Sequence, residues 1–274
     1  MHSAVDQAFT GSIPELYNSQ MVPLFVECYA ANLAGRLSGR PLSRLLEIAA
    51  GTGALTRALA STLHSNVAIV ATDLNRAMLD HAAAIGTKRP VEWRVADAML
   101  LPFEDEEFDA VVCQFGAMFF PDRAKAYAEV RRVLKPGGVF VFSVWDRIEE
   151  NEFADVVTTA LGLLFPDDPP RFLVRTPHGY FDSHVIEGDL RRAGFDASPQ
   201  IITVSQRGRA TSARIPAIAY CQGTPLRTEI ERQNPANPAL LAEATDVAER
   251  AIAQRFGRGA VDSKMQALFV SVEP

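Results

Sequence analysis

The sequence has few cysteines, no long apolar run and no excess of basic residues. Cys28, Cys113 and Cys221 form no CxxC pair, which argues against a disulfide framework or a zinc site and suits a reducing cytosol. The longest apolar run, at 139–145, covers about seven residues, against roughly 20 for a membrane-spanning helix. Since 33 acidic residues face 27 basic ones, the clustered positive charge of non-specific nucleic-acid binding is not expected.

The N-terminal residues also lack a basic segment followed by an apolar one, because Asp6 and Glu15 interrupt it early. We therefore expect no secretory signal, no membrane association and a cytoplasmic location. The 274 residues are 48% hydrophobic and 22% charged, a composition typical of a folded domain with a packed core. We expect a single domain spanning 1–274.

Apolar segments and helical patterns alternate from residue 44 to residue 145. A helical periodicity at 19–38 follows a segment, up to residue 17, that resembles a loop or short turn. Beyond it, strands are predicted at 45–48, 67–72, 91–95, 108–114 and 139–145, and helices at 54–62, 77–85 and 122–134. Asp122 is a candidate N-cap for the last of these helices, and the Lys-Pro-Gly-Gly segment at 135–138 should end it with a sharp reversal. This alternation predicts an α/β fold with a mostly parallel sheet and right-handed crossovers.

The alternation stops after Trp145. Residues 147–178 contain FPDDPPRF and read as a turn-rich connection, and residues 209–262 read as largely helical. Between and after them, a helix is predicted at 181–193 and strands at 200–206 and 264–272. We expect the two irregular segments, about 147–178 and 209–262, to form a helical cap over the carboxyl ends of the strands.

The segment RLLEIAAGTGALTRAL, at 44–59, is the most informative part of the chain. A short apolar run ends in an acid, passes through a loop of small residues and restarts as a helix, the order in which open α/β sheets build nucleotide-type sites. Gly51 and Gly53 allow backbone angles closed to other residues and let a ligand approach the main chain.

Three acids end three successive predicted strands: Glu47, Asp73 and Asp97. Their separations, 73 − 47 = 26 and 97 − 73 = 24 residues, each correspond to one strand–helix unit, so all three should line one crevice. An acid after the second strand suits a ribose diol, because one carboxylate can accept hydrogen bonds from both hydroxyls. An acid after the third could meet an adenine amino group, and the acid after the first favours a cationic ligand over a diphosphate.

Together with VADAMLLPFEDEEFDAVVCQFGAMFF and AEVRRVLKPGGVFVFSVW, this pattern resembles the class I S-adenosylmethionine-dependent methyltransferases. The resemblance covers roughly 44–145 and is closest to the small-molecule group that includes the ubiquinone/menaquinone-type enzymes. It implies a Rossmann-like doubly wound sheet of seven strands, mostly parallel with an antiparallel last strand. The implied cofactor is S-adenosylmethionine, with S-adenosylhomocysteine as product.

The resemblance also assigns cofactor contacts residue by residue. The loop from Ala49 to Gly53 would hold the methionine and ribose parts, Asp73 the ribose hydroxyls and Asp97 the adenine amino group. The other implied contacts are Tyr17 at the methionine end, Glu47 below the loop, Thr52 within it, Leu74 and Met78 at the adenine, Ala98 and Met99 beside Asp97, and Gln114 and Phe115 at the sulfonium. Ala49 departs from the family's usual glycine, so we expect a slightly altered loop that still binds.

The implied reaction is in-line transfer of the methyl group to an O-, C- or N-nucleophile of a small-molecule acceptor. No catalytic residue and no metal ligand is predicted. Gln114-Phe-Gly-Ala replaces the Asn-Pro-Pro-Tyr of amide and base N-methylation. His178, His184 and Tyr220 lie in or beside the expected cap, where an acceptor would be deprotonated, and a structural or solvent-facing role is the simpler interpretation for each. Met118, Phe119 and Phe120 belong to the core or the cap packing.

Two alternative functions fit part of the pattern. A nicotinamide (NAD)-dependent dehydrogenase also carries an acid about twenty residues after its glycine loop. It would place Glu47 close to a pyrophosphate and leave Asp97 without a role. A non-catalytic S-adenosylmethionine-binding module would keep the same loop and acids, since a fold does not fix a function.

Overall fold

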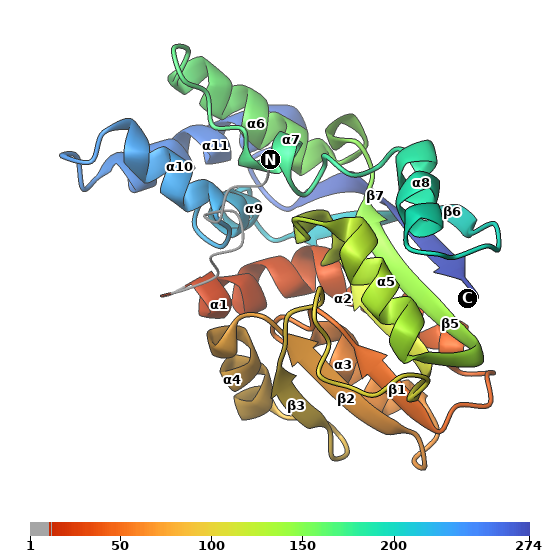
Figure 1. Cartoon of the computed structure of the whole chain (residues 1–274). Coiled ribbons are helices and arrows are strands. Elements are labelled where there is room, and N and C mark those ends of the chain that lie inside the picture. The colour runs from red at the N-terminus through yellow and green to blue at the C-terminus, as the bar shows by residue number, and fades with distance from the viewer. Residues whose placement is uncertain (1–10, 12) are drawn as a thin grey trace.

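A seven-stranded sheet runs through the centre of the molecule. The computed structural model describes residue 11 and residues 13–274, and its strands follow the order β3-β2-β1-β4-β5-β7-β6 (Figure 1). The strands are β1 Arg44–Glu47, β2 Ala68–Asp73, β3 Glu92–Val95, β4 Phe108–Gln114, β5 Leu134–Trp145, β6 Gln200–Ala210 and β7 Val261–Val272. β1 to β5 pair in parallel, and β7 is antiparallel to both β5 and β6. The predicted fold class is confirmed, and the antiparallel strand is the last in the chain.

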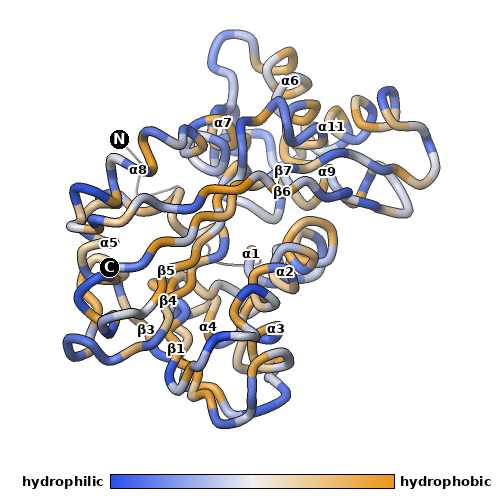
Figure 2. The backbone as a smooth tube through the Cα atoms, turned by 90° about the vertical axis from the view of Figure 1, so that its right-hand side faces the viewer, coloured by the Kyte–Doolittle hydropathy of each residue, from blue (hydrophilic) through white to orange (hydrophobic). Residues whose placement is uncertain are grey.

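The central strands are buried on both faces because their sequences are almost continuously apolar. β5 and β2 carry the longest runs of buried residues, and β4 and β5 are among the most hydrophobic parts of the backbone (Figure 2). Leu45 and Leu46 of β1 pair with Ala110 and Val111 of β4. Their register aligns the carboxyl ends of β1 and β4, where the site lies.

Helices cover both faces of the sheet. α2 packs against α3, and α5 packs against α8. The two pairs lie on opposite sides of β1, β4 and β5 (Figure 2). The helices are α1 Ile13–Leu16, η2 Tyr17–Val26, α2 Glu27–Leu37, α3 Ala54–Thr62, α4 Arg76–Ile85, η3 Ala117–Phe119, α5 Arg123–Val133, η4 Ile148–Glu150, α6 Glu152–Leu164, α7 Phe172–Arg175, α8 Ser183–Arg192, α9 Arg214–Cys221, α10 Leu226–Gln233 and α11 Leu240–Phe256. As predicted, Asp122 caps α5 by accepting a hydrogen bond from the Lys125 N–H at 2.9 Å.

The N-terminal segment differs from the loop expected before residue 19. α1 runs directly into η2, a π-helix with the wider i→i+5 hydrogen bonding, and Pro23 lies inside it. Proline has no N–H to donate, so this stretch cannot complete a regular hydrogen-bond ladder. Long π-helical stretches are rare and are found mostly at functional sites.

The Lys-Pro-Gly-Gly segment ends the preceding helix as expected, and it also forms a bulge inside strand β5. Leu134 already pairs with Phe108, and the next pair is Val139 with Ala110. Five steps along β5 thus oppose two along β4, so the intervening residues loop out of the sheet. Gly137, at a φ of +74°, permits this excursion.

The segments expected to form a cap are both helical. Residues 147–178 were predicted as a turn-rich connection, yet they include α6, where Phe153, Val157 and Leu161 share one buried face. α11 packs against α6 and α9, so the two distant segments form one layer above the strand ends (Figure 1). Among the described helices, none is long and apolar enough to cross a membrane.

Candidate active site

A large cavity opens at the carboxyl ends of the central strands. It spans about 1560 Å³ when the space open to solvent at its mouth is included. Its walls come from η2, the ends of β1, β2, β4 and β5, and the two cap segments. The cavity therefore brings the carboxyl ends of the strands and the cap segments to one space.

Glu47 lies at the floor of the cavity with 1% of its surface exposed. No described residue bonds its Oε2 atom, so one carboxylate oxygen is buried without a partner. Burial raises the pKa of Glu47 to about 8. A buried carboxylate of this kind costs folding free energy unless a ligand supplies a positive charge or a donor.

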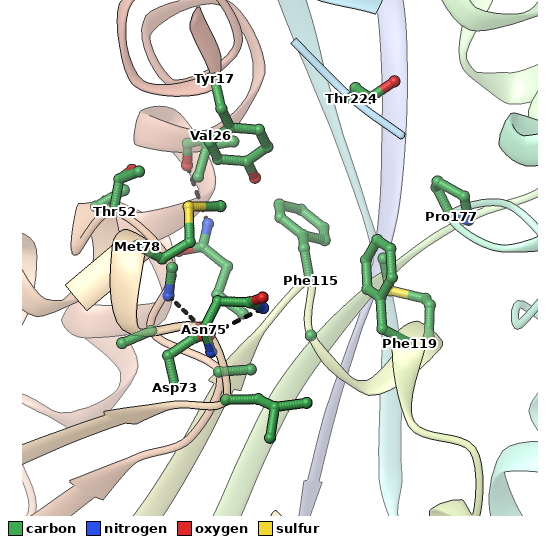
Figure 3. A pocket seen from close by; sticks show the side chains of 18 of the residues that line it. Tyr17, Val26, Thr52, Asp73, Asn75, Met78, Phe115, Phe119, Pro177 and Thr224 are labelled. Atoms are coloured by element: carbon green, nitrogen blue, oxygen red, sulfur yellow. Dashed lines mark hydrogen bonds between the residues drawn. The ribbon is translucent and has the colours of Figure 1, made fainter. Parts of the chain in front are cut away.

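Asp73 joins the end of β2 to the glycine loop. Its Oδ2 accepts a hydrogen bond from the Gly51 N–H at 2.8 Å, and its Oδ1 accepts one from the Asn75 N–H at 2.7 Å (Figure 3). Burial raises the pKa of this carboxyl group, and these hydrogen bonds counteract the rise. Asp73 thus fixes the loop as well as facing the cavity.

Ala49 adopts the left-handed backbone that its position requires, at a φ of +54°. Alanine at this angle is strained where glycine would not be, and the slightly altered loop expected from the sequence stays a prediction. The methyl group of Ala49 occupies the space beside Gly116, where an added Cβ would lie 2.4 Å from Ala49 Cβ. Gly116 therefore has to be glycine while residue 49 is alanine.

Phe115 and Gln114 form the wall after β4. Phe115 also has a left-handed φ, of +52°, and stacks on Trp145 with ring centroids 3.9 Å apart. Gln114 Nε2 donates to the Val26 carbonyl of η2 at 3.0 Å, which leaves its Oε1 buried and without a partner among the described residues. Strained backbone on two cavity walls is typical of functional sites.

Nearly all the residues assigned to the cofactor from the sequence meet at this cavity. Those that line it are Tyr17, Glu47, Ala49, Gly51, Thr52, Asp73, Leu74, Met78, Asp97, Ala98, Met99, Gln114 and Phe115. Gly53 does not. A Cβ there would lie 3.1 Å from both Ala82 and Trp93, so Gly53 permits close packing between α3, α4 and β3.

Sequence reasoning missed several lining residues. Met21, Phe25 and Val26 come from the unrecognised π-helix, and Trp145 ends β5. Asn75 donates its backbone N–H to Asp73. In the sequence, only its position two residues after that acid could have indicated this contact. Pro177 and Thr224 come from the cap segments, where no motif marks them. In Figure 3, Phe119, Pro177 and Thr224 lie across the cavity from Tyr17 and Asp73.

Of the three residues given a structural role in the simpler interpretation, two border the cavity. His178 and Tyr220 line it from the cap and are 5% and 8% exposed, whereas His184 is exposed on α8. Met118, Phe119 and Phe120, expected in the core or the cap packing, line it as well.

The floor of the cavity is suited to a cationic, donor-rich group. Glu47 Oε2 and Gln114 Oε1 are buried acceptors without partners among the described residues, and both border the same cavity. An ammonium group carries three donors and a positive charge, which would satisfy both. The α-ammonium of S-adenosylmethionine is such a group, so the residues present fit this cofactor.

Comparisons with known proteins agree with this geometry. Residues 46–142 match the family model described as "Methyltransferase domain". The chain is 32% identical over 197 residues to the ubiquinone/menaquinone biosynthesis C-methyltransferase UbiE of Burkholderia mallei, covering 67% of this chain and 79% of that protein.

Solved structures share the fold at lower identity. Phosphoethanolamine N-methyltransferase 2 of Haemonchus contortus, in complex with S-adenosyl-L-methionine, superposes with a TM-score of 0.59 at 18% identity, over 98% of this chain and 59% of that one. The YcgJ protein of Bacillus subtilis gives 0.55 at 19% identity, over 90% and 98%. The chain therefore belongs to the class I S-adenosylmethionine-dependent methyltransferases, in the group that includes the ubiquinone/menaquinone-type enzymes.

Proposed function

We propose that this methyltransferase acts on a small, flat and largely apolar acceptor that binds between Phe115 and the cap. The observation that carries the proposal is the distribution of charge in the cavity. Its acidic lining residues are Glu47, Asp73 and Asp97, all at the strand ends where the cofactor is expected. The remaining lining consists mainly of aromatic and aliphatic side chains.

The acceptor half of the cavity is walled by rings. Phe119 and Phe172 lie with centroids 6.4 Å apart, and Trp145 stacks on Phe115 at its border. Ring faces of this kind bind flat apolar molecules by stacking and by burial of apolar area. No Lys or Arg lines the described cavity, so an acceptor bearing a phosphate has no partner for its charge.

The cofactor contacts are part of the same proposal. Glu47 and Gln114 would hold the α-ammonium, Asp73 the ribose hydroxyls and Asp97 the adenine amino group. Asp97 Oδ1 accepts a hydrogen bond from the Met99 N–H at 2.8 Å, which leaves its second oxygen available for the adenine. The NAD-dependent alternative fits poorly, because a pyrophosphate beside the buried Glu47 would add negative charge to a site that already lacks a cation.

The protein's contribution to catalysis is alignment and exclusion of water. S-adenosylmethionine would supply an activated methyl group on a sulfonium. A nucleophile attacks that methyl carbon in line and displaces the thioether sulfur. Phe115 and Trp145 would hold the acceptor face against that methyl group, and the buried rings of the cap would keep water away. The relative UbiE is named as a C-methyltransferase; identification of the methylated product assigns the accepting atom here as oxygen, carbon or nitrogen.

We also infer a cytoplasmic enzyme in which the cap, about 147–178 and 209–262, selects the acceptor within one domain. Cys28, Cys113 and Cys221 are all free thiols, and two of them are buried, which supports a reducing compartment.

Cofactor binding is tested by calorimetric titration with S-adenosylmethionine, S-adenosylhomocysteine and NAD on one preparation. We expect micromolar binding of the first two only. Asp73→Ala should weaken S-adenosylmethionine binding at least tenfold without unfolding the protein. The matched variant Asp73→Asn keeps an acceptor for the Gly51 N–H, so it separates the loss of the loop contact from the loss of the ribose contact. Unchanged affinity in both variants would remove the ribose assignment.

The acceptor class is tested by transfer of labelled methyl from S-adenosylmethionine. We expect label in flat aromatic hydroxyl compounds and none in phosphoethanolamine. The reverse pattern would contradict the proposal.

A further inference from the structure

Among the described residues that line the cavity, His178 alone has a titratable nitrogen, and the fold holds its ring firmly. Its Nδ1 lies 2.8 Å from the backbone carbonyl oxygen of Asp146, and its backbone N–H donates to the Leu173 carbonyl at 3.0 Å. Its ring lies against Trp145, with centroids 6.2 Å apart. The side chain is therefore fixed from two sides before any ligand arrives.

These contacts also fix the position of the proton. A backbone carbonyl oxygen only accepts hydrogen bonds, so Nδ1 must carry the hydrogen. Nε2 then bears a lone pair, and no hydrogen bond from a described residue reaches it. Because His178 lines the cavity among mainly apolar side chains, this lone pair would be a specific partner for an O–H group of the acceptor.

The carbonyl that holds His178 is itself braced. Asn151 Nδ2 donates to the same Asp146 carbonyl at 3.3 Å and to the Gln266 carbonyl at 3.2 Å, and Gln266 Nε2 donates to Asp146 Oδ2 at 2.7 Å. This network ties the end of β5 to β7. It makes Asn151 a positioning residue for the histidine, in contrast to a residue that touches the reacting atoms.

We propose that His178 accepts the hydroxyl proton of the acceptor during methyl transfer, and this inference rests on the proposed function. The acceptor oxygen forms its bond to the methyl carbon while the carbon–sulfur bond breaks, and the electron pair of that bond stays on sulfur. The O–H proton passes to Nε2 of His178. The imidazolium releases it to water once the product has left.

The ionisation of His178 is compatible with this role. Burial lowers its pKa to about 4, and the hydrogen bond to Asp146 with the charges of Asp146 and Glu149 partly oppose that shift. The ring is thus neutral at pH 7. An oxygen that is gaining a methyl group becomes strongly acidic, so even a weak base can take its proton as the transfer proceeds.

The first test measures binding to protein saturated with S-adenosylhomocysteine. The probes are 2-naphthol and 2-methoxynaphthalene, which share a flat apolar ring system and differ in the hydroxyl hydrogen. Wild type should prefer 2-naphthol about tenfold, as expected for a buried hydrogen bond. His178→Phe keeps the ring and should abolish the preference, and the same substitution at the exposed His184 should leave it unchanged.

The outcomes separate the two proposals. A preference that survives in His178→Phe overturns the role of His178 and leaves the acceptor class standing. Failure of the wild type to bind either naphthalene overturns the acceptor class and, with it, this inference. If 2-naphthol is methylated, its kcat should fall about 100-fold in His178→Phe, while the affinity for S-adenosylmethionine stays the same.

A second measurement does not depend on a folded variant. In protein labelled with ¹⁵N-histidine, one of the five histidines should stay neutral down to pH 5 with Nδ1 protonated. Its Nε2 resonance should shift on addition of 2-naphthol and stay in place with 2-methoxynaphthalene. Five histidines that all titrate near pH 6.5, or an Nε2 resonance that ignores 2-naphthol, would overturn the proposal.

Discussion

Glu47 is a residue at which binding and stability oppose each other. In the folded protein its pKa is raised to about 8 by burial, so the native state holds a proton that the unfolded chain loses near pH 4.5. The stability associated with this proton is present at low pH and is lost as the pH rises from about 4.5 to about 8.

Glu47→Gln should therefore raise the free energy of unfolding of the ligand-free protein, relative to wild type, by more at pH 8 than at pH 5. The same variant should bind S-adenosylmethionine at least tenfold more weakly, because the amide cannot pair with an ammonium charge. Thermal unfolding at the two pH values and calorimetry measure both effects. Asp80→Asn, at an exposed acid of α4, is the control, and an equal gain at both pH values would contradict the explanation.

Ala49 and Gly116 form a second residue-scale pair. Gly116→Ala should lower the free energy of unfolding by about 2–3 kcal/mol, as expected for overpacking, because the new Cβ would lie 2.4 Å from Ala49 Cβ. The double variant Ala49→Gly/Gly116→Ala should recover part of that loss. The recovery should stay incomplete, because the new Cβ at position 116 would also lie 2.8 Å from Cys113 Sγ. Urea unfolding of the two single variants and the double variant forms the cycle, and simple additivity would contradict the packing argument.

At the scale of elements, Asp109 joins three strands at the end of the sheet away from the cavity. It accepts hydrogen bonds from the Ser43 and Arg44 N–H groups, both at 2.8 Å, and from Lys135 Nζ at 2.7 Å. These contacts hold its pKa well below the usual range. Asp109 thus links the starts of β1 and β4 to the bulge of β5.

Asp109→Ala should lower the free energy of unfolding by about 2 kcal/mol at pH 7, since the N–H groups of Ser43 and Arg44 and the Lys135 ammonium lose a charged acceptor. A carboxyl group with a depressed pKa stabilises above its unfolded pKa and loses that effect as the pH falls, so the difference from wild type should shrink below about pH 4. Urea titrations at pH 7 and pH 3.5 measure this. S-adenosylhomocysteine affinity should stay within twofold of wild type. A larger loss would mean that the hydrogen bonds of Asp109 also shape the site.

The strands and the acids at the strand ends were predictable from the sequence, because the strand–helix unit repeats along the chain. One strand–helix unit takes about 25 residues here, so Glu47, Asp73 and Asp97 could be placed at successive strand ends from spacing alone. The π-helix was not predictable in this way. Tyr17, Met21 and Phe25 recur every four residues, and that spacing is compatible with an ordinary helix until Pro23 is considered.

The acceptor half could not be predicted for a different physical reason. Trp145, His178 and Tyr220 belong to three separate segments, and only the packing of the cap brings them to one cavity. No periodicity connects their positions. Gly53 illustrates the converse, because its place in a familiar motif suggested a ligand contact where the structure shows packing between helices and a strand.

For the whole molecule, binding of S-adenosylhomocysteine should protect separate stretches of chain together. Amide hydrogen exchange should slow at 17–26, 47–53, 73–75 and 97–99, which border the cofactor half, and stay unchanged over most of α11. At 100 times its Kd the ligand should add about 2.7 kcal/mol to the free energy of unfolding. Exchange mass spectrometry checks the map, and protection of α11 without the glycine loop would contradict it.

The division of the cavity has a consequence for how such an enzyme can change. The strand ends proposed to face the methyl donor all precede residue 120, whereas most of the proposed acceptor wall follows residue 144. A crossover between two related genes near Trp145 would exchange one wall and retain the other. The antiparallel pairing of β7 with β5 sets the limit, because an imported cap must also carry a strand that fits that register. Substrate range can therefore diversify by recombination while the donor chemistry is inherited intact.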